Sequence, residues 1–201
     1  MKDPYFTTLL PLQRVGRKCD NVSRNRCPTS TEAAMLFRRA KKRLKDINRW
    51  EVVAGKEKAT FTLTDRFGHL IHRAPEVGDC IRIGLPKLKN RYGGGFDWVK
   101  IRFLQEREED DYQLIILRVQ PCPSPGKRKV AHFLHHKSSN TFLLIRKDKE
   151  VWASIHGRNE TINYSSGLIN SLRNVVAAWG GFMGLSQLQW QDFVDCLIER
   201  K

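Results

Sequence analysis

The residues best suited to chemistry in this 201-residue chain are its histidines. His132 and His136 lie in the segment VAHFLHH, which is typical of a strand, and alternate side chains of a strand share one face. His156, in a later predicted strand, could join them and offer three imidazoles to a metal ion. The same rings could instead be buried and hydrogen-bonded, and no Asp or Glu stands at the spacing of a two-histidine-plus-carboxylate site. We therefore predict neither a metal nor a cofactor.

The string HGRNE, which begins at His156, is the most site-like motif of the chain. Arg158 could bind an anion through two parallel hydrogen bonds, and His156 or Glu160 could transfer a proton. Together with His132 and His136, these residues are candidates for the site of a hydrolase-type enzyme. A structural alternative has the Gly and Asn of the string forming a turn while Arg158 pairs with Glu160. No G-x-S-x-G turn supports a Ser-His-Asp hydrolase.

Positive charge is the outlying property of the composition. The chain carries 36 Lys and Arg against 21 Asp and Glu, a net charge of +15, and more than half of this excess lies in residues 1–50. Clustered cations neutralise phosphates and release counterions, which favours nucleic acid as a partner. A solvated helix face or an acidic protein partner are the alternatives. The candidate nucleic-acid-binding residues of a predicted basic helix are Arg38, Arg39, Lys41, Lys42 and Lys45.

A second basic group follows in the middle of the chain. Lys87, Lys89 and Arg91 stand close to Tyr92 and Trp98. Cations beside aromatic rings are typical of surfaces on which single-stranded bases stack. The sequence therefore predicts a basic and aromatic lip here, secondary to the helix.

The elements that must position these residues indicate an α+β fold. Thr29 and Glu32 form a capping box, and a helix with one apolar stripe follows. From about residue 51 the period changes to that of strands. The predicted strands include CIRIGLP, DWVKIRF, YQLIILRV, VAHFLHH, NTFLLIRK and EVWASIH. Polar turns separate them, which predicts an antiparallel curled sheet or a small barrel.

The ends of the chain complete the predicted organisation. We expect residues 1–30 to form a basic, mostly irregular N-terminal arm and residues 31–201 to form a single α+β domain. Two apolar stripes after residue 165, separated by Gly180 and Gly181, predict a C-terminal helical hairpin packed on the sheet.

Cysteine usage and hydropathy bear on the compartment. Five cysteines at spacings that match no common zinc pattern indicate free thiols in a reducing compartment. No secretory signal is visible, and the least polar run is too short to span a bilayer. We expect a cytoplasmic protein of a bacterium or its equivalent.

Several segments resemble an uncharacterised bacterial protein family in which a "DWV" strand and an "HGRNE-x-x-N" string recur. They are GDCIRIGLP, GGGFDWVKI and HGRNE with Asn163. The resemblance covers residues 70–200 and leaves the basic N-terminal segment outside. It implies that HGRNE is a family feature and assigns no activity to any residue.

We therefore expect a non-enzymatic binding module that engages DNA or RNA through its basic residues. Two alternatives remain open. One is the hydrolase-type enzyme, which requires the 132–136 histidines and the HGRNE string to converge in one pocket. The other is a structural component of a larger bacterial assembly, docked on an acidic partner through its basic arm.

Overall fold

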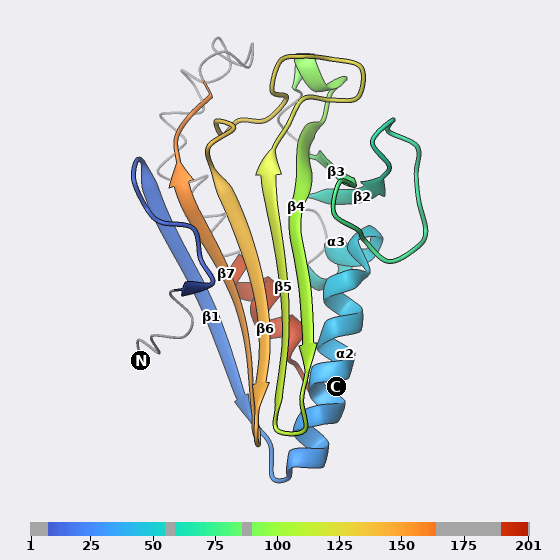
Figure 1. Ribbon diagram of the computed structural model, residues 1–201. Coiled ribbons are helices and arrows are strands. Elements are labelled where there is room, and N and C mark those ends of the chain that lie inside the picture. The colour runs from blue at the N-terminus through green and yellow to red at the C-terminus, as the bar shows by residue number, and fades with distance from the viewer. Residues whose placement is uncertain (1–7, 55–58, 86–89, 164–189, 201) are drawn as a thin grey trace.

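The fold is built on one antiparallel sheet of seven strands. The computed structural model describes residues 8–54, 59–85, 90–163 and 190–200. Within them the strand order is β1-β7-β6-β5-β4-β3-β2, and the sheet is open, ending in β1 and β2 (Figure 1). The strands are β1 (Arg17–Arg26), β2 (Thr60–Thr64), β3 (Cys80–Gly84), β4 (Asp97–Glu108), β5 (Tyr112–Pro121), β6 (Ser139–Lys147) and β7 (Glu150–Glu160). Of the two sheet forms that the sequence predicts, the structure has the open sheet.

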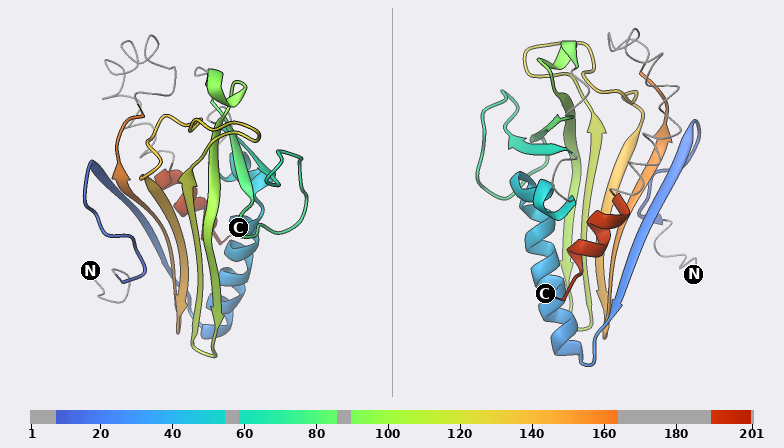
Figure 2. Two further views of the ribbon diagram at one scale, coloured as in Figure 1. Left: turned by 45° about the horizontal axis from the view of Figure 1, so that its top comes forward. Right: turned by 180° about the vertical axis from the view of Figure 1, so that it is seen from behind.

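One face of the sheet is covered by helices. These are α2 (Ser30–Lys45), the short η1 (Ile47–Arg49) and α3 (Trp50–Ala54), and a helical stretch at residues 190–197. Seen from behind, α2 and the C-terminal helix lie side by side across the strands (Figure 2, right). Thr29 is the N-cap of α2, and its side chain accepts a hydrogen bond from the amide of Glu32 at 3.1 Å. The capping pattern of the sequence thus marks the observed start of the helix.

The main core lies between these helices and the sheet. Leu36, Phe37, Ala40 and Leu44 of α2 are buried against apolar side chains of the central strands. The Trp50 ring centroid lies 4.9 Å from that of Phe142 on β6. It lies 5.2 Å from that of Phe193 on the C-terminal helix. This cluster fixes the helices on the sheet, because buried aromatic rings contribute large apolar areas.

The opposite face of the sheet carries a smaller core. Leu114 and Ile116 of β5 and Leu143 and Ile145 of β6 are buried there, packed with Leu9 and Leu10 among others. The N-terminal segment 8–16, which we call the strap, lies over this face (Figure 1).

The structure corrects two predicted elements. Residues 17–26 form β1, antiparallel to β7, and not an irregular arm. The segment VAHFLHH is a loop, which makes only the isolated bridges Pro123–Val130 and Leu134–Ile162. Its alternation of apolar residues reflects partial burial at the end of the sheet. The first arm of the predicted C-terminal hairpin lies outside the described residues.

None of the helices in the described ranges is long and apolar enough to cross a membrane.

Candidate functional site

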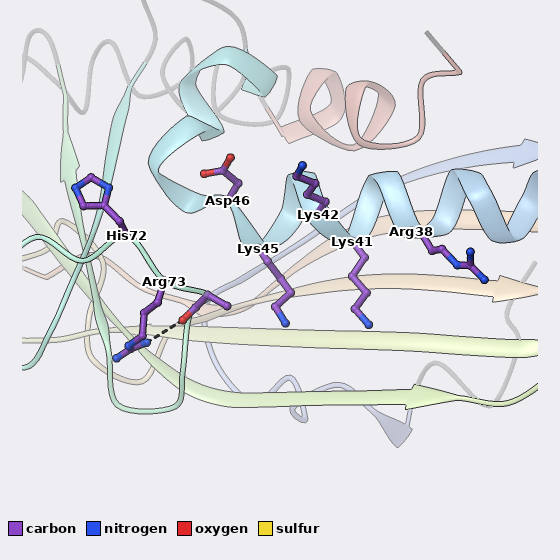
Figure 3. Close-up of a pocket in the computed structure, with 8 residues that line it drawn as sticks. Arg38, Lys41, Lys42, Lys45, Asp46, His72 and Arg73 are labelled. Carbon is purple, nitrogen blue, oxygen red and sulfur yellow. Dashed lines mark hydrogen bonds between the residues drawn. The ribbon is translucent and has the colours of Figure 1, made fainter.

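A basic groove opens beside the C-terminal half of α2. Its cavity of about 470 Å³ lies between this helix and the loop that joins β2 to β3 (Figure 3). It is lined by Arg38, Lys41, Lys42, Lys45, Asp46, His72, Arg73 and Ala74. Five cationic side chains and one carboxylate therefore line the same space, and the lining carries a net positive charge.

Two of these cations are bound to the sheet. Lys41 Nζ lies 2.7 Å from Glu106 and 3.0 Å from Glu108, and Lys45 Nζ lies 2.7 Å from the same Glu106. Partial burial works to raise the pKa of Glu106, but the hydrogen bonds and charges of both lysines hold that pKa below its usual value. Lys41 and Lys45 thus join α2 to β4, and their charge is largely balanced.

A third cation organises the wall of the groove. The guanidinium of Arg73 makes two hydrogen bonds to Asp79, of 2.7 and 2.9 Å. Asp79 also accepts the amide of Glu76 at 2.8 Å. This fork orders the β2–β3 loop next to α2.

Arg38 and Lys42 remain as the cations of the groove that are available to a ligand. Both side chains are exposed, and neither has an ion-pair partner among the described residues. They stand four residues apart and hence one helical turn apart. Lys42 leaves α2 in another direction from Lys41 and Lys45 (Figure 3).

The other arginines of α2 bind backbone carbonyls of residues 196–200. Arg43 donates to the carbonyl oxygens of Cys196 at 2.8 Å, Leu197 at 3.1 Å and Glu199 at 3.2 Å. Arg39 Nη1 donates to the carbonyl of Arg200 at 3.3 Å. These contacts give part of the basic helix a structural role that its sequence does not reveal.

The predicted basic and aromatic lip is described only in part. Lys87 and Lys89 lie outside the described residues, while Arg91 is exposed in η2 (Arg91–Gly93). Tyr92 is partly exposed beside Lys129, whose ammonium lies 5.1 Å from the ring centroid. Trp98, in contrast, is buried and donates its indole N–H to the carbonyl of Gly93 at 3.0 Å. It holds the η2 turn through this hydrogen bond, and its burial leaves no ring face on which a base could stack.

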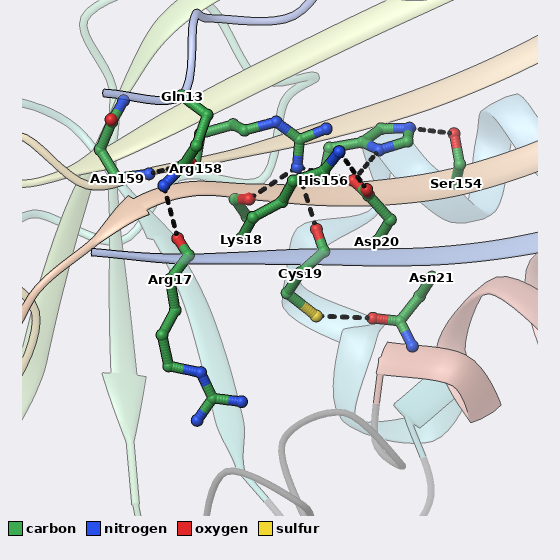
Figure 4. A network of polar contacts seen from close by, with 11 residues as sticks. Gln13, Arg17, Lys18, Cys19, Asp20, Asn21, Ser154, His156, Arg158 and Asn159 are labelled. Atoms are coloured by element: carbon green, nitrogen blue, oxygen red, sulfur yellow. Dashed lines mark hydrogen bonds and ion pairs between the residues drawn. The ribbon is translucent and has the colours of Figure 1, made fainter. Parts of the chain in front are cut away.

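A polar network lies on the strap-covered face of the sheet, at the edge formed by β1 and β7 (Figure 4). His156 Nδ1 is 2.6 Å from Asp20 Oδ1, and His156 Nε2 is 3.0 Å from Ser154 Oγ. Arg158 Nη1 lies 2.6 Å from the same Asp20 oxygen and 3.2 Å from the carbonyl of Cys19. Ser154, His156 and Arg158 alternate along β7, so the strand brings all three to one face.

Burial and hydrogen bonding determine the protonation states of His156 and Asp20 in this network. Burial lowers the pKa of His156, more than the hydrogen bond to Asp20 raises it. Partial burial works to raise the pKa of Asp20, but its bonds to His156 and Arg158 lower that pKa overall. With its proton on Nδ1, the neutral imidazole donates to Asp20 and accepts from the hydroxyl of Ser154. Ser154, His156 and Asp20 are therefore hydrogen-bonded in the same order as the residues of a Ser-His-Asp triad.

Of the three predicted catalytic histidines, only His156 belongs to this network, and His132 and His136 make none of these contacts. His132 is buried; its Nδ1 accepts the amide of Leu134 at 2.9 Å, and its Nε2 lies 3.9 Å from Asp97. His136 is exposed in the same loop. Among the described residues, no three His, Cys, Asp or Glu side chains come together in a way that could hold a metal ion.

The remaining residues of HGRNE are structural. Asn159 has a positive φ of 55°, and its side chain accepts the amides of Arg14 at 2.7 Å and Val15 at 3.2 Å. It also donates to the carbonyl of Leu12 at 3.0 Å. Burial raises the pKa of Glu160. Asn159 thus anchors the strap. The sequence analysis did not identify Asp20 and Ser154, which complete the polar network around His156.

Comparisons with known proteins give distant structural similarity. No family model and no curated protein matches the chain. A hypothetical protein from Helicobacter pylori is 10% identical with a TM-score of 0.49, covering 90% of this chain and 87% of that one. A protein from Nitrosospira multiformis is 11% identical with a TM-score of 0.39, covering 88% and 96%. Major latex-like protein 151 from Panax ginseng is 12% identical with a TM-score of 0.36, covering 88% and 95%. At these identities and TM-scores, the similarities assign no function to this chain.

Proposed function

We propose that this protein is a non-enzymatic binding module for nucleic acid, and that it binds phosphates in the basic groove. The observation that carries the proposal is the pair Arg38 and Lys42, two exposed cations one turn apart in a groove of about 470 Å³. The net charge of +15 supports it, because a polyanion is attracted to the whole surface before it reaches the groove.

The ion pairs in the groove reduce the number of cations that we expect to contact phosphate. Lys41 and Lys45 are balanced by Glu106 and Glu108, so they contribute less to an incoming anion than their number suggests. Arg38 and Lys42 have their charge uncompensated, and Arg73 presents a guanidinium that is already ordered. Replacing the first two therefore removes most of the binding energy while leaving the helix-to-sheet contacts intact.

The test measures affinity for labelled 20-nucleotide DNA and RNA, single-stranded and duplex, by fluorescence anisotropy at two salt concentrations. We expect Arg38→Gln/Lys42→Gln to weaken binding and to reduce the salt slope by between one and two units, because two phosphate contacts are lost. The matched control is Lys147→Gln/Lys149→Gln, which removes the same charge at the β6–β7 turn, beside the N-terminal end of α2. Equal effects of the two double variants would contradict a groove-specific site.

The same experiment also tests whether the groove binds an acidic protein and not nucleic acid. Polyglutamate of matched charge is added as a competitor. If it displaces nucleic acid at equal charge concentration, the groove recognises charge alone, and an acidic protein becomes the better candidate.

A second candidate function is a hydrolase-type enzyme with a site that differs from the predicted one, since it lacks His132 and His136 and is favoured by the Ser154–His156–Asp20 contacts. Here Ser154 would act as nucleophile and His156 as general base. An activity-based fluorophosphonate probe tests it. Labelling that Ser154→Ala abolishes would support the enzyme, and the absence of labelling in the wild-type chain would reject it.

A further inference from the structure

We infer that the nucleic acid bound by this protein is single-stranded, and that its bases stack on Phe67 and Tyr92, the aromatic pair. The inference rests on the proposed function, because it names the form of the ligand at that site. It depends on different residues from those of the basic groove, so the two can fail separately.

Phe67 is presented by a tight turn in the β2–β3 loop. Asp65 Oδ1 accepts the amides of Phe67 at 2.8 Å and His69 at 2.9 Å, which closes the turn. The Phe67 side chain is 62% exposed, although it is a large aromatic ring. The guanidinium of Arg66 lies 4.7 Å from the ring centroid. An ordered turn thus exposes the Phe67 ring to solvent with the guanidinium of Arg66 next to it.

Tyr92 is presented in the same manner by η2. Asn90 Oδ1 accepts the amide of Tyr92 at 3.1 Å, and Ser124 donates its hydroxyl to the Tyr92 carbonyl at 3.0 Å. Its side chain is 37% exposed, and Lys129 lies over the ring. Phe67 and Tyr92 are therefore both exposed and accompanied by a cation, and both stand on turns held by side-chain hydrogen bonds.

Buried Trp98 connects the two turns. A Cβ added at Gly68, next to Phe67, would lie 3.8 Å from Cη2 of the indole. A Cβ added at Gly93, next to Tyr92, would lie 3.0 Å from Cδ1 of the same indole. The glycines next to Phe67 and Tyr92 thus pack near opposite ends of the same indole. The η2 turn and the loop after β5 lie together at that end of the sheet (Figure 2, left).

This arrangement fits unpaired bases better than a duplex. Base faces are accessible to aromatic rings only where the strand is unpaired, whereas a duplex presents base edges and phosphates. The cations over the rings reinforce stacking and lie close to where the backbone phosphates would run. The loop that carries Phe67 continues to His72 and Arg73 of the basic groove, so one strand can contact both surfaces.

The test compares the affinities of Phe67→Ala/Tyr92→Ala for fluorescein-labelled dT20 and for a 20-base-pair duplex. We expect dT20 to bind about tenfold more weakly, the duplex to change less than twofold, and the salt slope for dT20 to stay the same. Phe67→Tyr/Tyr92→Phe keeps both rings and is expected to bind dT20 as the wild type does. Val22→Ala shortens an apolar side chain of β1 that is 51% exposed, between the values of Tyr92 and Phe67, and serves as the control.

Each outcome separates the two proposals. If Arg38→Gln/Lys42→Gln weakens binding but the alanine variant of the aromatic pair binds dT20 normally, the stacking inference is wrong and the groove stands. Equal losses for dT20 and duplex in the aromatic variant would also overturn the inference, since stacking is specific to unpaired bases. If the wild-type chain binds neither ligand at low salt, the proposed function itself fails.

Discussion

His156 Nδ1 lies 2.6 Å from Asp20 Oδ1, and the two residues are direct partners in the register of β7 and β1. Because the same Asp20 oxygen lies 2.6 Å from the buried guanidinium of Arg158, a single carboxylate balances the polar side chains of the strand. This contact ties an otherwise polar edge strand to the sheet. It also makes Asp20 the residue on which the network depends.

Replacing Asp20 is expected to destabilise the fold. Asp20→Ala leaves Arg158 buried without its carboxylate, and we expect a loss of about 1–3 kcal/mol in the free energy of unfolding, since bonds to charged groups are strong. Urea denaturation measures this. Lys18→Ala removes only an exposed ion pair to the same carboxylate and is expected to cost no more than about 1 kcal/mol. Equal losses in the two variants would show that the network is not a unit.

Stability is expected to fall as the pH decreases below about 7. Burial lowers the pKa of His132, more than the nearby Asp97 raises it, so the unfolded chain binds the proton more readily than the folded chain. The contribution of His132 is therefore complete above the unfolded-state pKa of about 6.5, and is lost as pH falls from there toward the lowered folded-state pKa. His156 acts in the same direction.

The variant that tests this is His132→Asn, whose side-chain oxygen can accept the Leu134 amide without titrating. Between pH 7 and 5, its unfolding free energy is expected to vary less steeply than that of the wild type, by up to about 1.4 kcal/mol per pH unit. Parallel pH profiles of the two proteins would contradict the assignment to His132.

The ion pairs between α2 and β4 are expected to stabilise the fold modestly. In a double-mutant cycle of Lys45→Met and Glu106→Gln, we expect a coupling energy of about 0.5–1 kcal/mol, because both side chains are partly exposed. Since the pKa of Glu106 is lowered, the coupling is present above the unfolded pKa of about 4.3 and is lost as pH falls through the folded value. Lys42→Met in place of Lys45→Met is expected to show no coupling with Glu106→Gln.

The strap is expected to depend on the side chain of Asn159. Asn159→Gly tolerates the positive φ but removes the side-chain hydrogen bonds to Leu12, Arg14 and Val15. We therefore expect trypsin, at the same concentration, to cleave the variant after Arg14 several times faster than the wild type. Asn159→Asp keeps the two amide contacts and loses only the bond to Leu12, and is expected to be intermediate. Cleavage at the wild-type rate in both variants would mean that the apolar contacts of Leu9 and Leu10 hold the strap.

The sequence predicts most of the sheet because the strand patterns are local. The apolar run of YQLIILRV marks β5, and the polar residues near Asp148 mark the turn between β6 and β7, where Asp148 has a φ of 51°. β1 escaped prediction because RKCDNVSRNR is polar on both faces, and its place as a strand depends on pairing with β7. The opposite error occurred at VAHFLHH, which was predicted as a strand and is a loop. Its apolar residues are buried by contacts of the loop at the end of the sheet, and not by strand pairing.

The sequence by itself determined the charge of the protein, the start of its long helix and the α+β composition, because these depend on residue types and on neighbours within a few positions. Only the tertiary structure decided which of the basic residues are available. Lys41 and Lys45 pair with carboxylates from β4, and Arg43 binds backbone carbonyls of the C-terminal helix. Arg38 and Lys42 line the groove without an ion-pair partner among the described residues. It likewise joined Asp20 to His156 and Ser154. The physical reason is that an ion pair or a hydrogen bond is set by distance in space, and those partners lie on strands far apart in the chain.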